Sequence, residues 1–242
     1  MRNEEFRETL KLMKRTFPIL GILTAILLSY ALYQALVVAP TEQTMGDVQR
    51  IFYYHVPSAW TAFILFFVNF GASIYYLIKR NPAADIVALV SAEVGVVFCT
   101  IVLVTGPILA RPVWGIWWTW DMRLTSTLVL WLIYVSYLFL RRFSAGGQTP
   151  ALAAALAVFG ALCVPFVYFS IWFFRTQHPQ PVMGGGGSID PRMMHVLLIN
   201  WLAFSCFAFL VCWSRYRLEK LQREVDEVHA LESLKDVPRS AR

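Results

Sequence analysis

A tryptophan-rich segment is the part of the sequence most suited to holding a large, flat ligand. Residues 111–123 contain four of the nine tryptophans in the chain, all within seven residues: Trp114, Trp117, Trp118 and Trp120. One or two tryptophans would suit a membrane interface, where the amphipathic indole ring is favoured. Four exceed what such anchoring needs, so the segment is predicted to form an aromatic platform that receives a flat hydrophobic ligand.

Two histidines from distant parts of the chain could complete such a site. A single histidine in a loop is usually only a polar residue, but His55 and His178 lie in separate polar stretches on either side of the tryptophans. Two imidazoles can ligate iron from both faces of a porphyrin. His195 is a weaker candidate ligand that suits a membrane interface, and His229 is set aside because it lies in the C-terminal tail.

Charged residues beside the tryptophans could serve the same ligand. Asp121 precedes a predicted helix, so its carboxylate could accept backbone N–H groups as an N-cap, contact the ligand, or do both. Arg123 carries a planar guanidinium suited to bidentate binding of a carboxylate. Arg50 and Arg111 are weaker candidates for that second task.

The elements that must position these residues are membrane-spanning helices. Of the 242 residues, 58% are hydrophobic and 15% are charged, whereas soluble domains are about 45–50% apolar. Glu93 is the one charged residue in the six long apolar runs, which can each cross about 30 Å of hydrocarbon as a helix. The runs are 18–38, 60–78, 86–109, 124–140, 150–174 and 196–214. The predicted fold is an all-α integral membrane protein with six transmembrane helices.

The distribution of basic residues predicts the orientation of these helices. With the N-terminus assigned to the cytoplasm, 16 lysines and arginines fall on the inner side and five on the outer side. This bias places both termini in the cytoplasm, so the net charge of +6 reflects topology and no nucleic-acid partner is expected. The predicted parts are an N-terminal segment 1–17, a six-helix domain 18–214 and a cytoplasmic tail 215–242, with outer loops at 39–59, 110–123 and 175–195.

Several smaller features are predicted around this framework. The spacing of Met45, Val48, Phe52 and His55 predicts a short amphipathic helix on the outer membrane surface, ended by Pro57. The 3-4-3 spacing of Leu218, Leu221, Val225 and Val228 makes a second amphipathic helix plausible in the tail. Gly184–Gly187 is interpreted as a slack tether in the third outer loop. The four cysteines, which all lie in predicted spans without a C-x-x-C motif, are interpreted as packing residues.

Glu93 is treated separately because an ionisable residue within a span is a candidate for function by default. It lies about 12 Å from the cytoplasmic end of its predicted helix at the usual helical rise. The hypothesis is that Glu93 faces the bundle interior and is protonated or hydrogen-bonded to a neighbouring helix.

The order of residues in the tryptophan segment resembles a known family signature. The pattern Trp114-Gly115-x-Trp117-Trp118-x-Trp120-Asp121-x-Arg123-Leu124-Thr125 is similar to that of the heme exporter protein C family (CcmC) of bacterial cytochrome c maturation. His55 in Tyr-Tyr-His-Val-Pro-Ser and His178 in Arg-Thr-Gln-His-Pro match the positions of that family's two external histidines. The six-helix layout matches over essentially the whole chain.

This resemblance implies a heme-handling protein of the bacterial inner membrane. Heme b would bind non-covalently at the outer, periplasmic face, with His55 and His178 as axial ligands of the iron. The resemblance places the tryptophan loop around the heme and implies delivery to a periplasmic heme chaperone. Asp121 is expected to shape the loop or contact that chaperone. ATP-binding cassette transporter subunits and a small single-span membrane subunit are the other implied partners. The chain has no nucleophile–base pair or nucleotide motif, so an enzyme is not expected, although loading the chaperone forms a covalent bond.

Three alternatives stay open at this point. The heme-handling subunit of the other cytochrome c synthesis pathway shares the tryptophan platform, but it is longer and usually continues with proline after the shared Trp-Asp. A multipass permease could cage a cation in the aromatic loop, although the predicted spans offer few polar residues for a pathway. A passive scaffold would dock a partner through its loops and bind no cofactor.

Overall fold

The computed structural model describes residues 2–144, 148–179 and 189–235, with side chains described from residue 16 to residue 233 within these ranges. The described residues contain no β-strand, and each of the six α-helices is long and apolar enough to cross a membrane. The predicted all-α fold with six transmembrane helices is therefore confirmed. The helices are α1 (Arg2–Tyr33), α2 (Phe52–Lys79), α3 (Pro82–Trp114), α4 (Met122–Phe143), α5 (Thr149–Phe173) and α6 (Pro191–Lys235), with a π-helical turn η1 (Gln34–Val38) and a 3₁₀ turn η2 (Asp47–Ile51).

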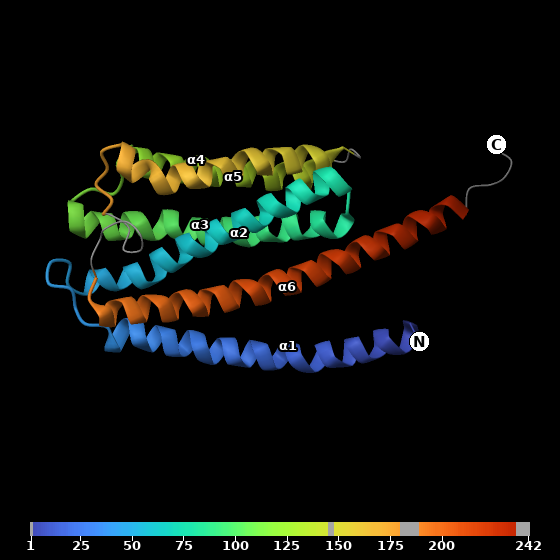
Figure 1. Cartoon of the computed structure of the whole chain (residues 1–242), viewed down its shortest axis with the longest axis horizontal. Coiled ribbons are helices and arrows are strands. Elements are labelled where there is room, and N and C mark those ends of the chain that lie inside the picture. The colour runs from blue at the N-terminus through green and yellow to red at the C-terminus, as the bar shows by residue number, and fades with distance from the viewer. Residues whose placement is uncertain (1, 145–147, 180–188, 236–242) are drawn as a thin grey trace.

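The helices run up and down along a common long axis (Figure 1). The α1–α2, α3–α4 and α5–α6 connections lie together at one end of the bundle, here called the loop end. The start of α1 and the end of α6 lie at the opposite end, here called the terminus end, together with the α2–α3 connection and the facing ends of α4 and α5. α4 and α5 pack on one side of α2 and α3, while α1 lies at the other edge against α6.

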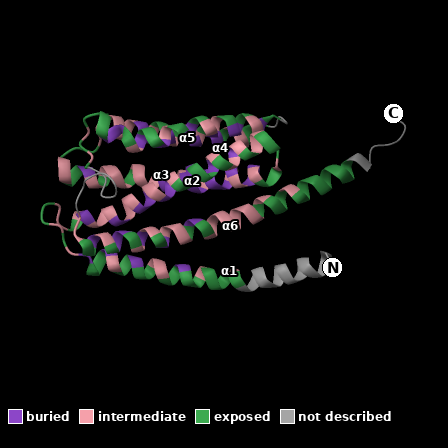
Figure 2. Ribbon diagram, viewed as in Figure 1, coloured by how far each residue is buried: buried purple, intermediate pink, exposed green. Residues whose placement is uncertain are grey.

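Close helix packing in the centre depends on small residues, as is common in membrane bundles. The rings of Phe66 and Tyr134 stack with centroids 3.9 Å apart and an interplanar angle of 13°. Gly95 allows α3 to approach α2, because a Cβ atom there would lie 2.8 Å from Cε1 of Phe66. Buried residues line the faces between helices, whereas much of α1 is exposed (Figure 2). Such exposed apolar faces suit a helix surrounded by lipid.

At the loop end, the helices extend beyond the apolar runs. α2 begins at Phe52 and α3 continues to Trp114, so the connection between α3 and α4 is much shorter than the predicted loop 110–123. The prediction that Pro57 ends a surface helix is wrong: Pro57 is buried within α2, and η2 leads directly into that helix. Near a helix N-terminus the missing proline N–H removes at most one helical hydrogen bond, which the surrounding packing tolerates.

At the terminus end, α6 continues as one helix to Lys235. The helix predicted in the tail is present, but it forms the last part of α6 and is not a separate element. Its four spaced apolar side chains are exposed. All four cysteines are free and lie in helices, in agreement with their interpretation as packing residues.

Two acidic residues of α3 connect that helix to its neighbours near the terminus end. Asp85 is buried and accepts two hydrogen bonds from Arg141 of α4, at 2.6 and 2.7 Å, and lies 2.8 Å from the Arg223 guanidinium of α6. Glu93 accepts two hydrogen bonds from Arg215 of α6, at 2.8 and 2.9 Å. The hypothesis that Glu93 is hydrogen-bonded to a neighbouring helix is confirmed. Its partner, Arg215, is the first residue of the predicted cytoplasmic tail.

Asp85→Asn should weaken the bundle, because it leaves the largely buried side chain of Arg141, which is 10% exposed, without a full charge partner. We expect a loss of about 3 kcal/mol in the free energy of unfolding, as for other buried pairs that lose one partner. Unfolding of the purified protein by sodium dodecyl sulfate in mixed micelles, followed by circular dichroism, measures this change. Glu224→Gln, which alters an exposed pair with Lys220 on α6, is the matched control and should behave like the wild type. Equal effects of the two variants would contradict the prediction.

Candidate functional site

His55 lies in the first turns of α2, whereas the sequence predicted it at the end of a separate short surface helix within the outer loop 39–59. Its Nδ1 lies 2.9 Å from Oγ1 of Thr105 on α3. The Thr105 hydroxyl donates its own proton to the carbonyl of Ile101 at 2.6 Å, so it accepts a hydrogen bond from Nδ1–H of His55. This arrangement fixes the tautomer and leaves the lone pair on Nε2, the state required of a neutral imidazole ligand.

The His55 ring also lies directly against the backbone of α3. A Cβ atom at Gly106 would be 3.4 Å from Cε1 of His55. The absence of a side chain at that position therefore leaves room for the imidazole beside Thr105.

His178 lies in the connection after α5 and has the same tautomer. Its Nδ1 is 2.9 Å from the carbonyl oxygen of Pro179, which can only accept, so Nδ1 carries the proton and Nε2 carries the lone pair. Loss of water around the imidazole, followed by the positive charge of Arg123, lowers the pKa of His178 to about 3. The imidazole is thus neutral at physiological pH and able to bind a metal.

Asp121 connects the tryptophan segment with the segment that carries His178. Its carboxylate accepts the backbone N–H of Leu124 at 2.9 Å, so Asp121 is the N-cap of α4. This confirms the first of the two roles predicted for Asp121. It also accepts hydrogen bonds from the hydroxyls of Thr119 at 3.2 Å and Thr176 at 2.7 Å. Thr176 in turn accepts the backbone N–H of His178 at 3.1 Å. One carboxylate therefore orders two loops.

These hydrogen bonds also govern the charge of Asp121. Burial acts to raise the pKa of the carboxyl, but the donors from Leu124, Thr176 and Thr119 outweigh it and hold the pKa below the ordinary value of 3.8. The carboxylate is therefore ionised over the whole physiological range.

The four tryptophans differ in exposure. Trp117 and Trp120 have relative exposures of 59% and 76%, whereas Trp114 and Trp118 are half-buried. The rings of Trp118 and Trp120 meet edge to face, with centroids 5.7 Å apart. Nε1 of Trp118 is buried and has no hydrogen-bond partner among the described residues. A buried N–H without an acceptor is unfavourable, so this donor is suited to a ligand oxygen.

Of the three candidate arginines, Arg123 lies near the histidines, whereas Arg111 and Arg50 have local structural roles. Arg123 is half-buried and donates to the carbonyl of Tyr168 at 3.4 Å, which leaves other guanidinium N–H groups without a described partner. Its charge influences His178. Arg111 donates to the carbonyl of Gly115, the left-handed residue that ends α3. Arg50 pairs with Asp47 at 3.1 Å and donates to the carbonyl of Ala35 at 2.9 Å, so it orders the first loop.

Two further predictions concern the third loop. His195 is exposed on the first turns of α6, which suits the interfacial role predicted for it. The glycine run 184–187 lies outside the described residues.

The sequence did not identify Thr105 and Thr176, which orient the two histidines. Thr105 could have been noticed as a hydroxyl within an apolar run, and Thr176 as a hydroxyl two residues before His178. Neither signal names its partner, because Thr105 is 50 residues from His55 and Thr176 is 55 residues from Asp121.

The loop end thus combines two neutral imidazoles with free Nε2 atoms, a half-buried guanidinium and exposed indole rings. Among the described residues, no three His, Cys, Asp or Glu side chains gather in a cluster that could hold a metal ion. The histidines can therefore supply axial ligands but not a complete protein-only coordination shell. The fold is that of a multi-pass α-helical membrane protein, and its candidate ligand site lies at one end of the bundle.

Comparison with known proteins identifies the family: the chain belongs to the heme exporter protein C family, whose model matches residues 3–231. It is 36% identical over 227 residues to heme exporter protein C of Bradyrhizobium diazoefficiens, covering 93% of this chain and 86% of that protein. It is 31% identical over 206 residues to heme exporter protein C of Escherichia coli K12, covering 85% and 82%. A putative cytochrome c biosynthesis ccmC-like mitochondrial protein of Arabidopsis thaliana is 34% identical over 187 residues, covering 77% and 70%.

The depressed pKa of Asp121 predicts that the loop end loosens in acid. A carboxyl whose folded pKa is lowered contributes stability that is present above its unfolded pKa and is lost as the pH falls through its folded pKa. We therefore expect tryptophan fluorescence to be constant at neutral pH and to change below the ordinary carboxyl pKa of 3.8.

Asp121→Asn keeps the capping ability at α4 but removes the titrating charge. This variant should lack the acid transition and lose about 1 to 2 kcal/mol of stability at neutral pH. Asp190→Asn, at another loop-end carboxyl of lowered pKa, is the control and should retain the transition. An unchanged transition in Asp121→Asn would show that another group causes it.

Proposed function

We propose that this protein binds heme b at the loop end and passes it to a periplasmic heme chaperone during c-type cytochrome biogenesis. The observation that carries the proposal is the matched state of His55 and His178. Each donates Nδ1–H to a protein oxygen and keeps a lone pair on Nε2. Membership of the heme exporter protein C family supports heme as the ligand.

The described residues fit such a cargo on grounds independent of the family. Heme supplies an iron with two open axial positions and two propionate carboxylates. His55 and His178 would hold the iron. Arg123, which has guanidinium donors to spare, and the unpartnered Nε1–H of Trp118 would bind the carboxylates. The exposed rings of Trp117 and Trp120 would cover the porphyrin by apolar contact.

The proposed function requires the loop end to face the periplasm, and the charge distribution agrees with that orientation. The excess of lysine and arginine at the terminus end supports a cytoplasmic position for that end, and the loop end would then face the periplasm across the bacterial inner membrane. The exposed tryptophans would be accessible to a periplasmic chaperone. The remaining proposed partners are the ATP-binding cassette subunits and the small single-span subunit of the maturation system.

We propose a carrier and not an enzyme. The residues at the loop end can bind, orient and neutralise a ligand, and the covalent bond to heme would form on the chaperone's own side chain. The structure offers little support for the permease alternative, because Glu93, the charged residue within the predicted spans, is already paired with Arg215.

The axial ligands can be tested by visible absorption spectra of the purified protein. Wild type should show a six-coordinate heme spectrum, and His55→Gly and His178→Gly should each weaken it, because each removes one ligand. Added imidazole should restore the spectrum by filling the vacated position. His195→Gly, an exposed histidine at the same end, is the matched control and should resemble wild type. A wild-type protein that is colourless when prepared with sufficient heme would contradict the proposal.

Thr105→Val tests whether orientation of His55 matters for heme binding. Valine preserves the shape of threonine but cannot accept the Nδ1–H of His55, so the ring loses its fixed tautomer. We expect heme affinity to fall by about tenfold, within the range for the loss of such supporting partners. Heme titration of the apoprotein provides the measurement. Thr105→Ser, which retains the hydroxyl, should bind nearly as tightly as wild type; a loss equal to that of Thr105→Val would point to packing instead.

A further inference from the structure

An elongated apolar groove lies between α6 and the α2–α3 pair, away from the histidine site. Its volume is about 620 Å³, within the usual range of about 300–1,000 Å³ for ligand pockets. Figure 1 shows α6 separating from α2 toward the terminus end, where this groove lies. Its walls include apolar side chains from all three helices: Ile64, Val68, Val87, Val90, Phe209 and Trp213.

The shape of the groove suits a linear chain better than a flat ring. Its lining residues on α6 run from Ser205 to Arg217, which is about 18 Å at the helical rise of 1.5 Å per residue. A volume of about 620 Å³ spread over that length gives a long, narrow space. An extended acyl chain has this form, and the apolar walls would contact it along its length.

The far end of the groove carries a positive charge. Tyr216 and Arg217 line it there, at the point where α6 leaves the apolar part of the bundle. Two neighbouring arginines of α6 are engaged: Arg215 with Glu93, and Arg223 with Asp85. Arg217 has no ion pair or hydrogen bond with any other residue in the described part of the chain. It is therefore the arginine available to an anionic ligand.

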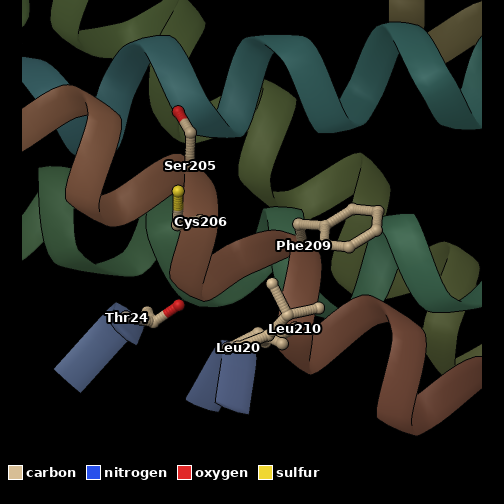
Figure 3. A pocket seen from close by; sticks show the side chains of 6 residues that line it. All are labelled: Leu20, Thr24, Ser205, Cys206, Phe209 and Leu210. Atoms are coloured by element: carbon tan, nitrogen blue, oxygen red, sulfur yellow. The ribbon is translucent and has the colours of Figure 1, made fainter. Parts of the chain in front are cut away.

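A second groove beside α6 provides a comparison. It holds about 260 Å³ between α1 and α6, and Figure 3 shows Leu20 and Thr24 of α1 facing Ser205, Cys206, Phe209 and Leu210 of α6. No charged side chain lines it. Both grooves can accept hydrocarbon, but only the larger one joins an apolar wall to a cation.

We propose that the larger groove binds one anionic phospholipid, with an acyl chain along α6 and the phosphate group on Arg217. Basic pockets between transmembrane helices are established sites for anionic lipid headgroups in general, and a guanidinium matches the geometry of phosphate oxygens. The lipid fills the space between α6 and the α2–α3 pair. This site goes beyond the proposed heme function and does not depend on it.

Native mass spectrometry of the full chain released from phosphatidylethanolamine nanodiscs containing phosphatidylglycerol tests the proposal. Wild type should retain one phosphatidylglycerol in preference to phosphatidylethanolamine. Arg217→Gln should lower that retention by about fivefold, the effect expected for one cation near a headgroup. Lys220→Gln removes an exposed cation of α6 that does not line the groove, and it should behave like wild type.

Val68→Trp is the second variant, because a large side chain there fills the groove and leaves Arg217 in place. It should also lower the retention of phosphatidylglycerol. Retention unchanged in Val68→Trp would mean that the lipid only touches the surface, and equal retention in Arg217→Gln and Lys220→Gln would mean that Arg217 has no special role. Equal binding of the two lipids by wild type would exclude an anionic ligand. Each of these three results overturns the proposal.

Discussion

The structure of the loop end depends on the hydrogen bonds that the carboxylate of Asp121 accepts. An ionised carboxylate only accepts hydrogen bonds and has about four acceptor positions, so it can gather donors from several chain segments at once. Here the donors are the N–H of Leu124, which begins α4, and the hydroxyls of Thr119 and Thr176. Through Thr176 the same carboxylate holds the backbone of His178. The tryptophan segment and the second histidine are thereby positioned relative to one helix end.

The two histidines are held to the rest of the fold by different kinds of contact. His55 belongs to the packed helix α2 and is fixed against α3 by Thr105. His178 lies in a connection, and its described contacts are the short-range bonds to Pro179 and Thr176. Loops move more readily than packed helices. Under the proposed function, heme would be anchored from α2 and freed from the side of His178.

The sequence could predict the helices but not the contacts between them. The six spans follow from hydropathy, and the N-cap role of Asp121 follows from its position before α4. The helix ends were less predictable, because α2 and α3 continue past the apolar runs and tolerate Pro57 and Pro112. The partners Thr105, Thr176 and Arg215 were not predictable, since each meets a residue at least 50 positions away. Such pairings arise from how the helices stack, which periodicity does not encode.

The hydrogen-bond acceptors of the two Nδ1–H groups would affect how tightly His55 and His178 hold iron. A carboxylate behind a metal-bound imidazole raises its basicity and strengthens the metal bond. In this site the Nδ1–H groups instead meet a hydroxyl, Thr105, and a backbone carbonyl, Pro179, both of them neutral. The nearby charge of Arg123 further disfavours positive charge on His178. Under the proposed function, these neutral acceptors would strengthen the bonds to iron less than a carboxylate would, and the charge of Arg123 would weaken the bond from His178. The site would then orient heme without retaining it against a chaperone that offers a stronger bond.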